Sequence, residues 1–124
     1  IFKSNHKGTI SADLQAIERI MDNLIDNAIK YSEKGSDITI STVNDSDGYI
    51  KVMIKDNGEG IADEDINHIF SRFYRTASAR ATENQGSGLG LAIVKHLVNS
   101  LNGEVGIESK PQEGSTFWFT VPCV

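Results

Sequence analysis

The stretch that decides the fold is LQAIERIMDNLIDNAIKY, residues 14–31. Its apolar residues recur at steps of three and four, the spacing of one face of an α-helix. This stripe consists of Leu14, Ile17, Met21, Leu24 and Ala28. Asp13 stands just before it, where a capping residue is expected. The pattern predicts a long helix, capped by Asp13 and ending at Tyr31, with one buried face.

The rest of the chain alternates between strand-like and helix-like segments. Strands are expected at about residues 1–10, 37–44, 49–56, 104–109 and 115–121, and further helices at about 63–70 and 89–101, the latter ended by Gly103. The polar residues 74–87 have no regular period and predict a long loop, functional or mobile. Helices standing between antiparallel strand pairs favour an α+β fold, a two-layer sandwich with the helices on one sheet face.

The composition is that of one compact domain over residues 1–124. Hydrophobic residues make up 39% and charged residues 23%, which allows a real core and argues against a disordered chain. The single cysteine, Cys123, cannot form an intrachain disulfide, so a reduced, cytoplasmic setting is expected. No apolar run is long enough to span a bilayer. Because the chain starts at Ile1 rather than Met, we expect a fragment of a longer protein.

The charge balance restricts the partners. The net charge is −5, from 12 basic and 17 acidic residues, and the basic residues are scattered rather than striped. This distribution argues against a nucleic-acid surface. An anionic ligand would therefore need a metal ion, helix termini and a few chosen cations to offset its charge.

A second face of the predicted helix is polar. Asn23, Asn27, Lys30 and Tyr31 are spaced by three or four residues and so share one side. One explanation is a solvated surface. The other is a metal and phosphate site, because an amide oxygen suits Mg²⁺ and a lysine neutralises phosphate. The residues alone leave both open.

Two glycine-rich segments suggest ligand contacts. In DNGEG, residues 56–60, the pattern fits a tight turn, but the Asp56 carboxylate is also an acceptor suited to the amine of adenine. In GSGLGL, residues 86–91, glycines lead into the last helix, where exposed N–H groups favour phosphate. This spacing is neither the dinucleotide G-x-G-x-x-G nor a P-loop. The alternative for the second segment is a flexible loop that happens to adjoin a helix.

Aromatic residues are expected to serve mainly in packing. Phe70 and Phe73 are spaced so that both pack against the core at the end of a short helix. Arg75 has two explanations: it binds phosphate with its fixed charge, or it is an ordinary surface residue. In the last strand Trp118 alternates with its two Phe neighbours, so it should lie on the other sheet face and pack there.

In this order and spacing the motifs resemble the catalytic domain of sensor histidine kinases, within the gyrase, Hsp90, histidine kinase and MutL ATPase superfamily. The resemblance covers about residues 11–122. Its boxes are the N box at 23–32, G1 at 56–60, F at 70–75, G2 at 86–90 and a last glycine motif at 114–117. It implies a mixed sheet of about five strands covered on one face by three helices.

The resemblance also implies ATP and Mg²⁺ as cofactors. Asn27 would bind the metal, and Asn23, Lys30 and Arg75 would act on the phosphates during transfer. Residues 74–87 would form a mobile ATP lid. The remaining nucleotide contacts would be Tyr31, Asp56, Gly58, Gly60, Ile61, Phe70, Gly86, Ser87, Gly88, Leu89, Gly90, Leu91 and Thr116.

The implied activity is that of an ATP-dependent protein-histidine kinase in two-component signal transduction. No acceptor histidine with its acidic neighbour is present, so the acceptor is expected on a separate helical dimerisation domain of the parent, with a response regulator as indirect partner. The parent is expected to be an inner- or cell-membrane sensor with this domain in the cytoplasm. Asn102 and Ala62 depart from the family pattern without touching the expected chemistry.

Two alternatives remain from the sequence. One is another enzyme of the superfamily, a serine kinase or a conformational ATPase, although Asn23 stands where a hydrolytic enzyme would need a glutamate. The other is a nucleotide sensor without catalysis, against which Asn27, Asp56 and the G2 glycines weigh.

Overall fold

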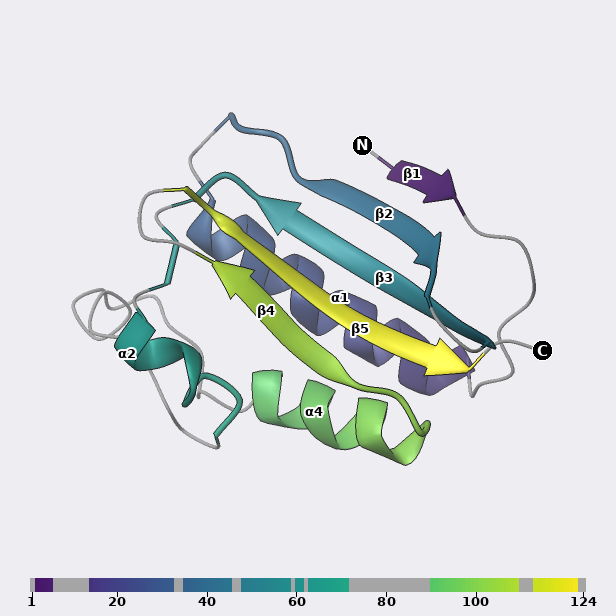
Figure 1. Cartoon of the computed structure of the whole chain (residues 1–124). Coiled ribbons are helices and arrows are strands. Elements are labelled where there is room, and N and C mark those ends of the chain that lie inside the picture. Colours follow the sequence, from purple (N-terminus) through teal and green to yellow (C-terminus); the bar gives the residue numbers. More distant parts are fainter. Residues whose placement is uncertain are drawn as a thin grey trace.

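A five-stranded sheet with two long helices on one side and a short helix at its end makes up the part of the chain that the structure, a computed structural model, describes (Figure 1). The described residues are 2–5, 14–32, 35–45, 48–58, 60–61, 63–71, 90–109 and 113–122. The strands are β1 (Phe2–Asn5), β2 (Thr39–Asn44), β3 (Tyr49–Asp56), β4 (Val105–Ser109) and β5 (Ser115–Pro122). The helices are α1 (Leu14–Tyr31), α2 (Asp63–Ile66) and α4 (Gly90–Ser100).

The sheet is mixed, as expected. Its strand order is β1-β2-β3-β5-β4, and β1 runs parallel to β2 while every other neighbouring pair is antiparallel. The predicted elements are found within about two residues of their expected ends where the structure describes them, except that α2 ends at Ile66 and is followed by turns to Phe70. The α+β sandwich is therefore confirmed.

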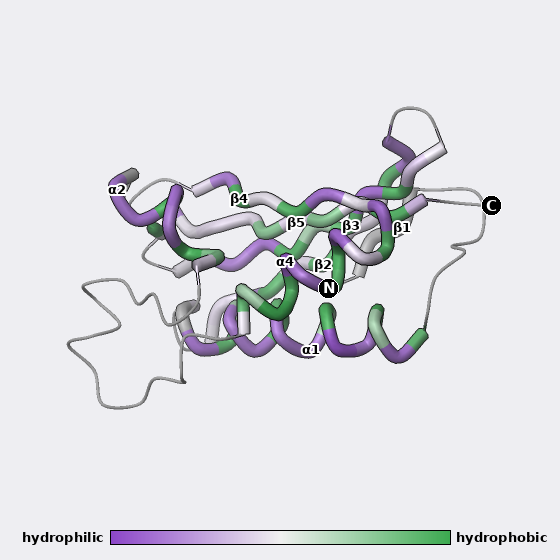
Figure 2. Tube along the Cα trace, turned by 90° about the horizontal axis from the view of Figure 1, so that it is seen from below, coloured by the Kyte–Doolittle hydropathy of each residue, from purple (hydrophilic) through white to green (hydrophobic). Residues whose placement is uncertain are grey.

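The helices form the second layer. Figure 2 shows α1 and α4 on the same side of the sheet, with the strands stacked above them. The two helices contact each other, α1 also contacts β3, and α4 contacts β4 and β5. The opposite face of the sheet carries Trp118, whose ring lies 4.5 Å from the Lys51 ammonium, so the tryptophan packs on that face as predicted.

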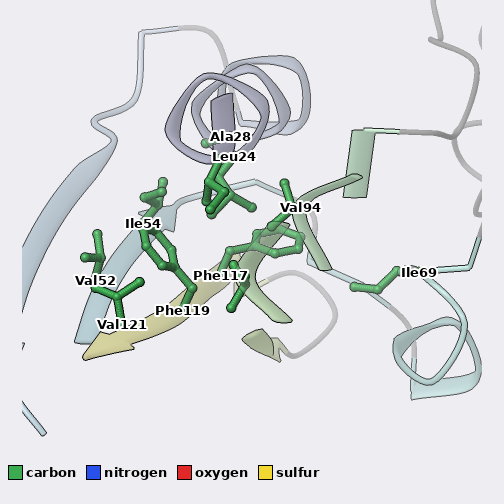
Figure 3. Packing of buried hydrophobic residues seen from close by; sticks show 11 residues of the cluster. Leu24, Ala28, Val52, Ile54, Ile69, Val94, Phe117, Phe119 and Val121 are labelled. Atoms are coloured by element: carbon green, nitrogen blue, oxygen red, sulfur yellow. The ribbon is translucent and has the colours of Figure 1, made fainter. Parts of the chain in front are cut away.

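The core lies between the two layers. Leu24 and Ala28 of α1 point toward Ile54 and the phenylalanines of β5 (Figure 3). The prediction was wrong at Leu14, which is 69% exposed, whereas Ile20 is fully buried. The buried stripe therefore centres on Ile20, Leu24 and Ala28, and Leu14 at the start of α1 lies outside the core.

The end of α4 also differs in detail from the expectation. The residue in the left-handed region is Asn102, with φ of 64°, and the N–H of Gly103 donates to the Val98 carbonyl at 3.0 Å. Gly103 is needed for another reason, because a Cβ there would collide with the backbone carbonyl of Thr120. A Schellman-type ending thus passes the chain from α4 into β4.

One end of the sandwich gathers the segments that the sequence singled out. The end of α1, the end of β3, the start of β5, α2 and the start of α4 all lie at the left of Figure 1. This end is where the motifs of distant sequence positions come together.

Candidate functional site

The centre of this end is the Asp56 carboxyl group. Asp56 is the last residue of β3 and is only 3% exposed. Its Oδ1 accepts the N–H of Gly58 at 2.9 Å. Burial raises the pKa of Asp56 above its ordinary value, while hydrogen bonds from the Gly58 and Ser115 backbones oppose that rise. A buried acceptor-only group is thereby held at a fixed position.

The turn after β3, which the structure describes at residues 57, 58, 60 and 61, is shaped by glycine. Gly58 is buried beside Asp56, and Gly60 adopts a φ of 75°, a conformation that side chains with a Cβ rarely take. Ile61 follows, partly buried against the core, and its N–H donates to Oγ of Ser109 at 2.8 Å. The turn is therefore anchored at both of its ends.

The start of β5 supports the same carboxyl group. A Cβ on Gly114 would collide with the Asp56 carbonyl oxygen and lie 3.1 Å from Cα of Asn57, so only glycine fits here. Ser115 pairs with Asp56 in the sheet and is 6% exposed. Its backbone and hydroxyl thus lie beside the Asp56 carboxyl, although the sequence motifs give Ser115 no role of its own.

Thr116 does not join this group. It pairs with Lys55, one step along the β3–β5 register from the pair of Ser115 and Asp56. Because successive side chains of a strand point to opposite faces, Thr116 lies on the face of the sheet that carries Trp118. The nucleotide contact predicted at Thr116 stays a prediction, on the opposite sheet face from Asp56 and Ser115. Strand alternation is the sequence signal that could have placed Ser115 on the face opposite Trp118.

The polar face of α1 meets the start of α4. A Cβ added to Gly90 would stand 3.5 Å from Oδ1 of Asn23, so the first residue of α4 lies directly against that amide. The structure thus brings together two motifs 67 positions apart, the N box and the last glycine of G2.

The other polar residues of α1 lie along the same helix. Asn27 is one turn after Asn23 and, like it, partly buried, while Lys30 is exposed in the last turn. Asn27 and Lys30 therefore extend the Asn23 face toward the end of α1, where β3 also ends (Figure 1). Tyr31 is the final residue of α1, and its side chain lies outside the described part.

Apolar residues separate the site from the core. Phe70 packs edge-on against Phe117, with ring centroids 6.4 Å apart and an interplanar angle of 84°. Phe70, Ile61 and Leu91 are partly buried and all pack against the core cluster. These three residues, each a predicted nucleotide contact, therefore lie between the core and the end of the sandwich that carries Asp56.

Several expected site residues lie outside the described residues. They are Arg75, Gly86, Ser87, Gly88 and Leu89, together with the proposed lid at residues 74–87. Of the GSGLGL segment, the structure describes Gly90 and Leu91.

The polar groups of this end are mainly side-chain amides and backbone N–H groups. Within the described ranges no three His, Cys, Asp or Glu residues are grouped so as to hold a metal. Amide oxygens are present instead, and Mg²⁺ is commonly held by one or two protein oxygens with phosphates and water supplying the rest. The amide oxygens of α1 therefore fit a metal ion that arrives with a phosphate ligand.

The sequence is similar to sequences of known proteins. The family model described as histidine kinase-, DNA gyrase B- and HSP90-like ATPase matches residues 12–124. Sensor histidine kinase WalK of Bacillus subtilis is 39% identical over 114 residues, 91% of this chain and 19% of that protein. Sensor-like histidine kinase SenX3 of Mycolicibacterium smegmatis is 44% identical over 100 residues, 81% of this chain and 26% of that protein.

Solved structures show the same likeness. The mycobacterial sensor histidine kinase MprB superimposes with a TM-score of 0.87 at 29% identity, covering 98% of this chain and 82% of that one. Full-length ShkA in complex with AMPPNP gives a TM-score of 0.83 at 26% identity, covering 99% of this chain and 26% of that one. Among the described residues, no helix is both long and apolar enough to cross a membrane.

Proposed function

The chain belongs to the histidine kinase-, DNA gyrase B- and HSP90-like ATPases, as the catalytic ATP-binding domain of sensor histidine kinases, and we propose that it binds Mg-ATP and donates the γ-phosphoryl group to a histidine on a separate helical domain. The chain spans 19% and 26% of the two curated relatives above, so the acceptor domain is sought in the rest of the parent. The observation that carries the proposal is the buried Asp56 carboxyl, aimed by its bond from Gly58.

At the base end, Asp56 would accept the exocyclic amine of adenine. Its Oδ1 is already engaged by Gly58, and the second oxygen remains an acceptor. A guanine would present a carbonyl oxygen there and leave two acceptors facing each other. The proposal therefore includes selectivity for adenine, with the Ser115 side of β5 and the turn after β3 lining the base.

At the phosphate end, the start of α4 and the polar face of α1 would hold the triphosphate. Gly90 brings the helix backbone close to Asn23 without a Cβ between them, and the N-terminus of α4 carries a partial positive charge. Lys30 adds a full charge at the end of α1. Gly86, Ser87, Gly88, Leu89 and Arg75 are proposed contacts from outside the described residues.

Asn27 is the proposed protein ligand of Mg²⁺, which when bound offsets phosphate charge and orients the γ-phosphoryl group. The role of this chain's own residues is to hold the nucleotide. In the transfer, the bond from γ-phosphorus to the β–γ bridging oxygen breaks, ADP leaves with the electron pair, and a phosphorus–nitrogen bond forms to the acceptor ring. The proton of the ring nitrogen leaves to a base outside this chain.

The same site argues against hydrolysis. Asn23 occupies the place where a water-activating carboxylate would be needed, and an amide cannot accept that proton. We therefore favour the kinase over a conformational ATPase. A response regulator would be the later recipient of the phosphoryl group, and the domain would work on the cytoplasmic side of a membrane-bound parent.

The test mixes the domain, Mg-ATP labelled at the γ-phosphate, and the parent's helical domain supplied separately. A phosphohistidine on the helical domain supports the kinase. Nucleotide binding without transfer would support a sensor, and steady phosphate release in the absence of the helical domain would support an ATPase. Asp56→Ala in parallel should remove the transfer.

A further inference from the structure

The Ser109 hydroxyl, at the end of β4, joins three segments. Its Oγ accepts the N–H of Ile61 at 2.8 Å, donates to the Gly114 carbonyl at 3.0 Å, and lies 2.8 Å from Oγ of Ser115. No motif in the sequence marks this residue. It lies in the last pair of the β4–β5 ladder, opposite Ser115, and β4 is an edge strand.

The hydrogen-bonding capacity of this hydroxyl is fully used. A serine has one O–H donor and two lone pairs. When its proton goes to the Gly114 carbonyl, both lone pairs accept, one from the Ile61 N–H and one from the Ser115 hydroxyl. The bond from Ile61 has a fixed direction, because an amide N–H can only donate.

This network fixes the far end of the turn after β3. The near end is held at Asp56 by Gly58 and by the close approach of Gly114. The far end is held where the Ile61 N–H reaches Ser109, directly after Gly60 with its left-handed backbone. Without the Ser109 hydroxyl, the Ile61 N–H would lose this bond, and the turn would be anchored at its near end only.

We propose that Ser109 is a positioning residue for adenine recognition, acting through the turn after β3 rather than by touching the nucleotide. This inference rests on the proposed function, because it assumes that the turn faces the base. A turn anchored at both ends keeps the wall of the base site in place before binding, and misplacement of such a wall weakens binding without unfolding the protein. The phosphate end of the site, on α1 and α4, should be unaffected.

The test measures binding of Mg-ATP and Mg-GTP by calorimetry to the wild type, Ser109→Ala and Ser109→Thr. Ser109→Ala should bind ATP about tenfold more weakly and lose most of its preference over GTP, because only the base wall is disturbed. Ser109→Thr keeps the hydroxyl and should stay close to the wild type. The matched control is Ser100→Ala, which removes a serine bond of 2.6 Å to Leu97 at the exposed end of α4 and should change neither affinity.

The outcomes separate the two proposals. Equal ATP affinity and equal selectivity in Ser109→Ala and the wild type would overturn the positioning role and leave the proposed function standing. A wild type that binds no nucleotide would overturn both. If Ser109→Ala does not fold, Ser109→Cys keeps the shape with a weak acceptor, and unchanged selectivity in that folded variant would equally refute the role.

Discussion

Gly90 opens α4 directly against Asn23 of α1, with only 3.5 Å between Oδ1 of the asparagine and the place a Cβ would occupy. This contact links a motif on the first helix to one on the last. It leaves a space about one methyl group deep beside an amide and a helix N-terminus. In the proposed function, a phosphate group of the nucleotide occupies that space.

Gly90→Ala tests whether the space is used. The added methyl would meet Asn23 at an ordinary contact distance, so the fold should tolerate it. Affinity for Mg-ATP should nevertheless fall about tenfold, because the phosphates would lose their approach to the backbone. Thermal unfolding and calorimetry on the same sample measure both effects. An alanine variant that binds like the wild type would show that phosphate does not approach Gly90.

The Asp56 carboxyl should make stability depend on pH. Burial raises the pKa of Asp56 in the folded state above the ordinary 3.8. The protonated carboxyl therefore stabilises the fold fully below pH 3.8, and this stabilisation is lost as pH rises through the folded-state pKa. Asp56→Asn removes this dependence. The free energy of unfolding of Asp56→Asn minus that of the wild type should therefore increase with pH, measured in urea from about pH 4 to pH 8.

A matched control for that experiment is Asp26→Asn, which removes a negative charge from an exposed position of α1. It accounts for the change in net charge alone. A difference between Asp56→Asn and the wild type that stays flat or decreases as pH rises would contradict the raised pKa.

Asn27→Ala should weaken the magnesium dependence of nucleotide binding. The partly buried amide is the proposed metal ligand, and alanine removes its oxygen while favouring the helix. We expect a rise of about tenfold in the Mg²⁺ concentration needed for half-maximal ATP binding. Asn99→Ala, on an exposed position of α4, is the control. An unchanged magnesium titration would remove Asn27 from the coordination shell.

The end of α4 offers a test of the fold alone. Asn102 is the described non-glycine residue with positive φ, at 64°. Asn102→Gly should relieve that conformation and stabilise the domain by about 0.5 kcal/mol, a rise of a few degrees in Tm. Asn99→Gly, inside α4, should instead lower stability by up to about 0.5 kcal/mol. If both glycines destabilise equally, the left-handed assignment is wrong.

Periodicity predicted the elements of the fold, because burial imposes a repeat on the sequence. The 14–31 pattern gave the full length of α1, and alternation placed β3 at its observed bounds. The error at Leu14 has a physical cause: periodicity shows which face is apolar but not how far the sheet extends beneath it. Ile20 is buried and Leu14 exposed although both carry large apolar side chains.

Site residues could be predicted from the sequence only where a short motif contains the chemical groups of the site. Asp56 and Gly90 stand in short motifs whose residue types suggest an acceptor and an anion site. Ser115 was missed, yet strand alternation from Phe117 would have placed it beside Asp56. Ser109 could not have been found, because its three bonds depend on the register of β4 against β5 and on where the chain returns at Ile61.

The central claim is that an adenine nucleotide lies with its base at Asp56 and its phosphates at the start of α4. The most direct test is a calorimetric titration of the wild type and Asp56→Asn with Mg-ADP. Asn keeps an acceptor for the Gly58 N–H but offers the adenine amine a second amine instead of an oxygen. We predict one site in the wild type and at least tenfold weaker binding in the variant. No heat from the folded wild type, or equal affinity in both proteins, would contradict the account.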